Sequence, residues 1–249
     1  MKKLYLVLRS GLLWAVSLTH FFIGATFLVS LGMLIDPRKT DSLQRFFARN
    51  VLRLAGVRFE VRYAPGFDPR RTSIFVCNHV NIFDPFVVYS AVPQFARGWE
   101  LEEHFDVPVY GRMMKRFGNV PVARRPTPAA LKKMLKLTKE ALDNGVSVVV
   151  FAEGGRTLDG RVQPFRDGIF RMLRQLPYPI VPMSIVGSFE FHRKGSRMLY
   201  PSKIVVYIHD TIETAGLELD KEEAELFREK VQRIVSAPVN TAIDGCGEV

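Results

Sequence analysis

Residues 119–151 read NVPVARRPTPAALKKMLKLTKEALDNGVSVVVF, and this stretch decides the fold class. Asn119–Val122 is a short apolar run, and Thr127-Pro128 then supplies a helix cap followed by proline at the first helical position. The helix that follows ends at Asn144-Gly145, which is typical of a helix terminus. Val146–Phe151 returns as an apolar strand. A strand, helix, strand order predicts parallel strands joined by a right-handed crossover.

Further apolar runs on both sides extend this pattern. Ile74–Cys77, Ile180–Val186 and Ile204–Ile208 are strand candidates, and Asp220 precedes a final amphipathic helix as a cap. We therefore predict an α/β fold with a mixed, largely parallel sheet flanked by helices, formed by residues 57–249 as one domain. Ligand-binding loops of such sheets cluster beyond the carboxyl ends of the strands.

The N-terminus has a different composition. Residues 10–35 carry no charged side chain, and as a helix they are long enough for the roughly 30 Å hydrocarbon layer. Basic side chains alternate with apolar ones from Arg38 to Arg58, which is typical of an amphipathic helix at a lipid surface. We predict that residues 1–56 form a membrane-embedded or membrane-surface helix pair. A span and insertion into one leaflet both stay open, and a cleaved signal peptide is disfavoured by the length of the apolar run.

Composition narrows the class of partner. The 249 residues hold 35 basic and 25 acidic side chains, a net charge of +10, which favours anionic partners. No nucleic-acid recognition motif accompanies this charge, so we expect membrane lipid and no nucleic acid. Cys77 and Cys246 are far apart, which indicates a reducing compartment without a structural disulfide. The five histidines lack zinc-site spacing, so we expect no metal and no cofactor.

The loop after Ile74–Cys77 contains the strongest candidate for chemistry. His79 and Asp84 are five positions apart, which requires a turn to bring the carboxylate onto the imidazole. An imidazole oriented by a carboxylate can take a proton from a hydroxyl group near neutral pH. Asp84 could equally be only a helix cap. Cys77 offers a third possibility, a thiolate nucleophile paired with His79.

Two other strand ends carry cations. Arg124 and Arg125 follow the strand at Asn119–Val122, and Glu153-Gly154-Gly155-Arg156 follows Val146–Phe151. A guanidinium group matches phosphate oxygens, and glycine lets the backbone approach a ligand closely. Each segment alone could be an ordinary surface turn.

The order of these motifs resembles the glycerolipid acyltransferase family, whose best-known members are 1-acylglycerol-3-phosphate acyltransferases. The family's Asn-His-x-x-x-x-Asp motif matches Asn78, His79 and Asp84, and its glycine and arginine six apart match Gly118 and Arg124. Its Phe-Pro-Glu-Gly-Thr-Arg motif matches at four positions and departs at Ala152 and Gly155. The fourth motif, an apolar run with a central proline, resembles residues 180–183.

The resemblance implies transfer of a fatty acyl group from acyl-CoA or acyl carrier protein to the free hydroxyl of 1-acylglycerol 3-phosphate, giving phosphatidic acid. It implies His79, held by Asp84, as general base. It also implies substrate binding by a set of residues that includes both arginines: Asn78, Gly118, Arg124, Glu153, Gly154, Gly155 and Arg156. We expect the enzyme at a membrane, on the cytoplasmic face of the inner (plasma) membrane.

Other functions fit part of the pattern. The two departures from the third motif leave open a different acceptor, such as another lysophospholipid, a lyso-aminolipid or glycerol 3-phosphate. A thioester hydrolase could use the same base to activate water. A noncatalytic lipid-binding protein of the membrane surface would explain the charge and the apolar N-terminus, but not the pairing of His79 with Asp84.

Overall fold

A computed structural model describes residues 2–214 and 221–245. Asp220, the expected helix cap, and Cys246 lie outside these residues. The described strands form one seven-stranded sheet in the order β1-β7-β6-β2-β5-β3-β4. Their bounds are β1 Val57–Tyr63, β2 Ile74–Cys77, β3 Ala96–Leu101, β4 Val120–Val122, β5 Ser147–Phe151, β6 Ile180–Val186 and β7 Ser202–Ile208.

The sheet is largely parallel, as the sequence predicts. β4 and β5 both pair in parallel with β3, so β3 lies between the two strands of residues 119–151. Only the pairing of β6 with β7 is antiparallel in the described sheet. β3 was not apparent from the sequence because it contains Arg97 and Glu100 within six residues.

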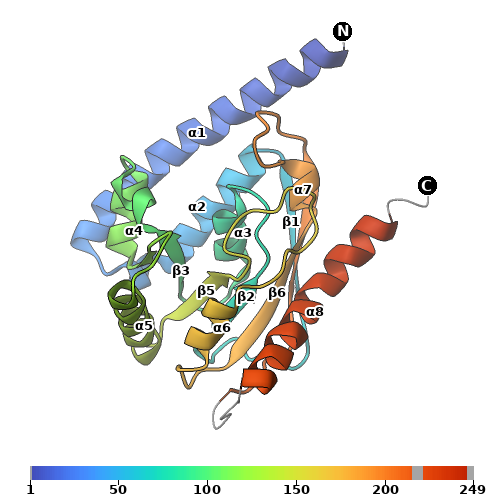
Figure 1. Ribbon diagram of the computed structural model, residues 1–249. Coiled ribbons are helices and arrows are strands. Elements are labelled where there is room, and N and C mark those ends of the chain that lie inside the picture. Colours follow the sequence, from blue (N-terminus) through green and yellow to red (C-terminus); the bar gives the residue numbers. More distant parts are fainter. Residues whose placement is uncertain (1, 215–220, 246–249) are drawn as a thin grey trace.

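Helices cover both faces of the sheet (Figure 1). They are α1 Lys2–Leu34, α2 Asp41–Leu54, α3 Asp84–Ala91, α4 Tyr110–Phe117, α5 Pro128–Asp143, α6 Asp167–Leu173, α7 Ser188–Phe191 and α8 Lys221–Gly245, with short 3-10 turns at Pro37–Thr40 and Glu102–Asp106. Alternation along β2 separates two cores. Phe75 and Cys77 pack in the core that contains residues of α1 to α4, whereas Ile74 and Val76 pack in the core that contains α6 and α8.

The apolar N-terminal helix lies along the domain. α1 buries Ser10, Ser17, Ala25 and Leu28 and contacts α2 and α4 (Figure 1). The Ser10 hydroxyl group donates to the carbonyl oxygen of Leu199 at 3.2 Å, which ties α1 to a loop far along the chain. The opposite side exposes large apolar residues along the length of the helix: Leu4, Leu8, Leu12, Val16, Phe22, Ile23, Phe27 and Leu34. By length and composition, this helix could cross a membrane.

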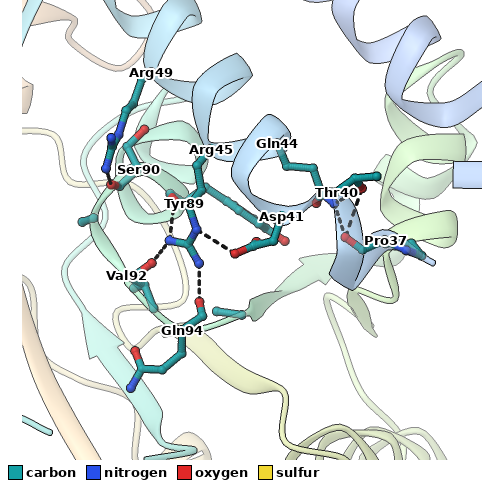
Figure 2. Close-up of polar contacts among 12 residues, drawn as sticks. Pro37, Thr40, Asp41, Gln44, Arg45, Arg49, Tyr89, Ser90, Val92 and Gln94 are labelled. Atoms are coloured by element: carbon teal, nitrogen blue, oxygen red, sulfur yellow. Dashed lines mark hydrogen bonds and ion pairs between the residues drawn. The ribbon is translucent and has the colours of Figure 1, made fainter. Parts of the chain in front are cut away.

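α2 packs on the domain through its apolar side. Its Phe47, Val51 and Leu52 lie in the core, and two of its basic residues bind carbonyl groups of the protein. Figure 2 shows Arg45 donating to the carbonyl oxygens of Tyr89, Val92 and Gln94. Arg49 donates to the carbonyl oxygen of Ser90 at 3.2 Å. The physical reason is that the last carbonyl groups of a helix, here α3, lack partners within the helix.

Candidate active site

The loop between β2 and α3 brings His79 and Asp84 into direct contact. The Nδ1 atom of His79 lies 2.8 Å from Oδ2 of Asp84. The Asp84 side chain is fully buried, and its Oδ2 atom also accepts the backbone N–H groups of Val80 at 2.5 Å and Asn81 at 2.9 Å. Its Oδ1 atom accepts the hydroxyl group of Ser188 at 2.8 Å. Four donors therefore fix this carboxylate, and it fixes the imidazole ring.

Asp84 is not the helix cap that the sequence suggested. Phe83 occupies the N-cap position of α3, and Asp84 is the first residue of the helix. Its carboxylate turns back onto the preceding loop, where it accepts the Val80 and Asn81 amides. The loop amides thus compensate for removing a carboxylate from water, a cost that an isolated buried charge could not bear.

The neighbouring strand β5 holds the other side of His79. The imidazole stacks on the ring of Phe151, with 4.1 Å between ring centroids. The backbone N–H of His79 donates to Oε1 of Glu153 at 2.6 Å, and its carbonyl oxygen accepts the N–H of Thr157 at 2.9 Å. The side chain keeps 20% of its surface exposed, and Nε2 makes no hydrogen bond within the described residues. A hydroxyl group can therefore reach Nε2.

Glu153 positions the loop of the base. Besides the His79 amide, its carboxylate accepts the backbone N–H of Gln163 at 2.8 Å through Oε2. Burial raises the pKa of this carboxyl group to about 7, with a further rise from the negative charge of Asp84, although the two amide bonds act to lower it. Glu153 therefore positions the backbone of His79, and its 6% exposure leaves little surface for a ligand.

The residues after Glu153 form an open strip. Gly154 adopts a φ of 65°, in the left-handed region that favours glycine, and both Gly154 and Gly155 are exposed. The half-buried Arg156 makes no ion pair within the described residues. Glycine backbone and an unpaired guanidinium group beside the candidate base make this strip suited to an anion.

The second predicted motif lies further away in the sheet. Gly118 ends α4 with a φ of 77°, and Arg124 follows β4, which only β3 separates from β5. Arg124 is exposed and pairs with Glu103, with 2.7 Å between Nη2 and Oε2. Solvent screens exposed pairs of this kind, so the guanidinium group can exchange this partner for a ligand.

Asn78 connects the loop between β2 and α3 to strand β6. Its side-chain N–H donates to the carbonyl oxygen of Ile185 at 3.0 Å, and its oxygen accepts the Ile185 N–H at 2.8 Å. With 1% exposure, Asn78 is placed to support the loop rather than to contact a substrate. Sequence reasoning missed Asn81 and Ser188, which bond to each other and to the Asp84 loop. Asn81 belongs to the recognised motif loop, but Ser188 gave no signal because it is 104 residues from Asp84.

The alternative nucleophile Cys77 is excluded by its surroundings. Its thiol group is buried on the sheet, 3.8 Å from the carbonyl oxygen of Val150. Burial, with the negative charges of Asp84 and Glu153, raises the pKa of Cys77 well above its usual value. A neutral buried thiol cannot attack a substrate. Among the residues that the structure describes, no three His, Cys, Asp or Glu side chains are grouped to hold a metal ion.

An apolar cavity extends from the active-site loop toward the N-terminal helices. The empty space within it and at its mouth, including space open to solvent, is about 680 Å³. Phe151, which stacks on His79, and Pro85, which follows Asp84, line one part of it. Leu28 of α1 and Phe47 of α2 line another part. The cavity therefore lies between the sheet and the N-terminal helix pair, next to residues that adjoin His79 and Asp84, and its apolar lining suits an unbranched hydrocarbon chain.

A base held by a carboxylate, an anion-suited strip and an apolar cavity are the parts that an acyl transfer site needs. Residues 57–186 match the Acyltransferase family, and the chain belongs to it. Among solved structures, the chain is similar to "1-acyl-sn-glycerophosphate (LPA) acyltransferase, PlsC, from Thermotoga maritima". The match has a TM-score of 0.80 and 22% identity, and it covers 96% of this chain and 97% of the other.

Sequence relatives carry a related name. The chain is 31% identical over 152 residues to the chloroplastic 1-acyl-sn-glycerol-3-phosphate acyltransferase BAT2 of Brassica napus, covering 61% of this chain and 44% of that protein. It is 27% identical over 149 residues to the coconut (Cocos nucifera) 1-acyl-sn-glycerol-3-phosphate acyltransferase, covering 60% and 48%. The chain thus spans about half the length of the curated relatives it matches.

Proposed function

We propose that this protein transfers a fatty acyl group from acyl-CoA or acyl carrier protein to the free hydroxyl group of 1-acylglycerol 3-phosphate. The product would be phosphatidic acid for phospholipid synthesis. The observation that carries this proposal is the contact of 2.8 Å between Nδ1 of His79 and Oδ2 of Asp84, with Nε2 of His79 free of hydrogen bonds to the described residues. The similarity to 1-acylglycerol-3-phosphate acyltransferases supports this acceptor.

In this mechanism, the Nδ1–H group of His79 donates to Asp84, which leaves the Nε2 lone pair to take the proton of the acceptor hydroxyl group. The hydroxyl oxygen attacks the thioester carbonyl carbon, so a C–O bond forms and a tetrahedral intermediate results. Its collapse breaks the C–S bond, and the imidazolium returns the proton to the departing thiolate. No acyl-enzyme is needed.

Substrate binding follows from the surroundings of the loop. The apolar cavity would hold a fatty chain, because Phe151 and Pro85 join its wall to the base. Arg156 and Arg124 would bind the acceptor phosphate, and Arg124 would leave Glu103 to do so. The exposed apolar side of α1 would lie in the lipid that supplies the acceptor.

The test is transfer of radiolabelled acyl groups from acyl-CoA, and then from acyl carrier protein, by the detergent-purified protein. A panel of acceptors would include lysophosphatidic acid, other lysolipids, a lyso-aminolipid and glycerol 3-phosphate. His79→Ala should lower the rate by about a hundredfold or more, whereas His104→Ala, an exposed histidine, should not. A folded His79→Ala protein with full activity would refute the mechanism, and exclusive use of another acceptor would refute the assigned substrate.

A further inference from the structure

Arg166 lies beside the candidate active site, although no recognised motif contains it. Its backbone N–H donates to the carbonyl oxygen of Ala152 at 2.9 Å, and its Nε–H donates to the carbonyl oxygen of Glu153 at 3.1 Å. The carboxylate of the same Glu153 accepts the backbone N–H of His79. Glu153 thus connects the Nε end of the Arg166 side chain with the loop that carries His79.

Gly154 provides the space that Arg166 occupies. A Cβ atom at position 154 would lie 2.2 Å from Nε and 2.6 Å from Cδ of Arg166, closer than real contacts allow. Because Gly154 has no side chain, the Cδ and Nε atoms of Arg166 can pass directly over the backbone at this position. Arg166 is held at two points, and less rotamer freedom remains to be lost when the guanidinium group binds a ligand.

The terminal nitrogens of Arg166 have no partner among the described residues. Within the described residues they make no ion pair or hydrogen bond, and the side chain is exposed. The adjacent carboxylates have other partners: Asp167 pairs with Arg228 at 2.5 Å, and Glu153 accepts two backbone amides. The positive charge of Arg166 is therefore not neutralised by its immediate neighbours.

Two unpaired arginines consequently flank the exposed glycine strip. Arg166 crosses Gly154, and Arg156 directly follows Gly155 in the chain. A guanidinium group that is anchored through Nε offers its terminal N–H groups as a fork, the geometry that binds phosphate oxygens in pairs. An arginine held for structure alone would be expected to use this fork on a carboxylate or carbonyl group.

We infer that Arg166 binds a phosphate group of one of the two substrates, together with Arg156 across the strip at Gly154 and Gly155. This inference rests on the proposed function. Two sources supply the same chemistry: the phosphomonoester of the lysophosphatidic acid acceptor and the phosphates of the coenzyme A or phosphopantetheine carrier. Arg166 would then act on the affinity for a substrate and not on the proton transfer at His79.

The test compares Arg166→Gln, which removes the charge, with Arg166→Lys, which keeps the charge but loses the fork. Arg171→Gln is the matched control, because Arg171 is exposed on α6 and makes no ion pair within the described residues. Each variant is first shown to have the thermal midpoint of the parent protein. The KM of each substrate is then measured with the other at saturation, and the dissociation constants of lysophosphatidic acid and of coenzyme A are measured in a His79→Ala background.

For Arg166→Gln we expect one KM, and the matching dissociation constant, to rise by about tenfold with little change in kcat, because a charge-assisted hydrogen-bond pair is lost. The KM and dissociation constant of Arg166→Lys should lie between those of Arg166→Gln and the parent. Higher constants for lysophosphatidic acid identify the acceptor phosphate as the ligand, and higher constants for coenzyme A identify the carrier phosphate. If Arg166→Gln matches Arg171→Gln in both constants, the inference is refuted. If the parent transfers no acyl group but the dissociation constant still rises, the proposed function fails and this inference stands.

Discussion

Ser188→Ala tests whether a residue outside the recognised motifs holds the catalytic carboxylate. The Ser188 hydroxyl group donates to Oδ1 of Asp84 at 2.8 Å, and this oxygen has no other partner within the described residues. Since Asp84 is fully buried, water cannot replace the lost donor. A hydrogen bond to a charged group contributes about 1.5–3 kcal/mol, so we expect a loss of about 2 kcal/mol of stability. For a chain of this size, that is a fall of roughly 4–8 °C in the melting temperature.

Ser90→Ala is the control, because it makes the same chemical change at the same 1% exposure. The hydroxyl group of Ser90 has no hydrogen-bond partner in the part of the chain that the structure describes, so its removal should leave the melting temperature within about 1 °C. Thermal unfolding in detergent gives the melting temperatures, and acyl transfer gives kcat. We expect kcat of Ser188→Ala to fall by about three- to tenfold, because Asp84 then holds His79 less firmly. Equal melting temperatures and equal kcat for the two variants would refute this account of Asp84.

Gly154→Ala should lower stability by about 1–3 kcal/mol in chemical denaturation, because a φ of 65° and a contact of 2.2 Å with Arg166 both oppose a side chain. Gly155→Ala, where a Cβ meets nothing within 4 Å, is the control, and equal losses would contradict the reason given. Gly98→Val would narrow the apolar cavity, so mass spectrometry of the product should show a shift toward shorter acyl chains; an unchanged chain profile would count against this cavity as the chain site. Burial raises the pKa of Glu153 from 4.5 to about 7, so between these pH values the folded state binds a proton that the unfolded state has lost. The stability of the parent relative to Glu153→Gln should therefore fall as pH rises from about 4.5 to 7. Melting temperatures of both proteins across this range check the sign, and a relative rise would refute it.

Much of the fold could be predicted because its signals are local. Thr127 caps α5 by accepting the Ala130 N–H at 3.2 Å, and Gly145 has the positive φ that ends this helix. The predicted strand Ile180–Val186 has the observed bounds of β6. Hydrophobic periodicity, caps and turn residues act within a few positions, so they can be read from neighbouring letters.

Charge patterns do not show which basic residues have partners within the protein. The composition of α2 gave no sign that Arg45 binds carbonyl groups at the C-terminal end of α3. Arg97 made β3 difficult to recognise, yet its side chain is buried against the rings of Phe95 and Phe117. The carbonyl groups that Arg45 binds are 44 to 49 residues away, and Phe117 is 20 residues from Arg97, so composition alone could not indicate these partners.

By itself, the sequence determined the α/β class and the apolar N-terminal helix, and it placed His79 and Asp84 on one short loop, because these features depend on local signals. The contact between the two side chains was one of several possibilities until the structure showed it. Only the tertiary structure decided which groups complete that pair. Ser188 reaches Asp84 across 104 residues, and Glu153 reaches the His79 amide across 74. Arg166 crosses Gly154 because the chain returns to Ala152, the residue after β5, where the Arg166 amide donates to the Ala152 carbonyl oxygen. The physical reason is that hydrogen bonds and close approaches depend on distance in space, which strand order and loop closure set and the local sequence does not.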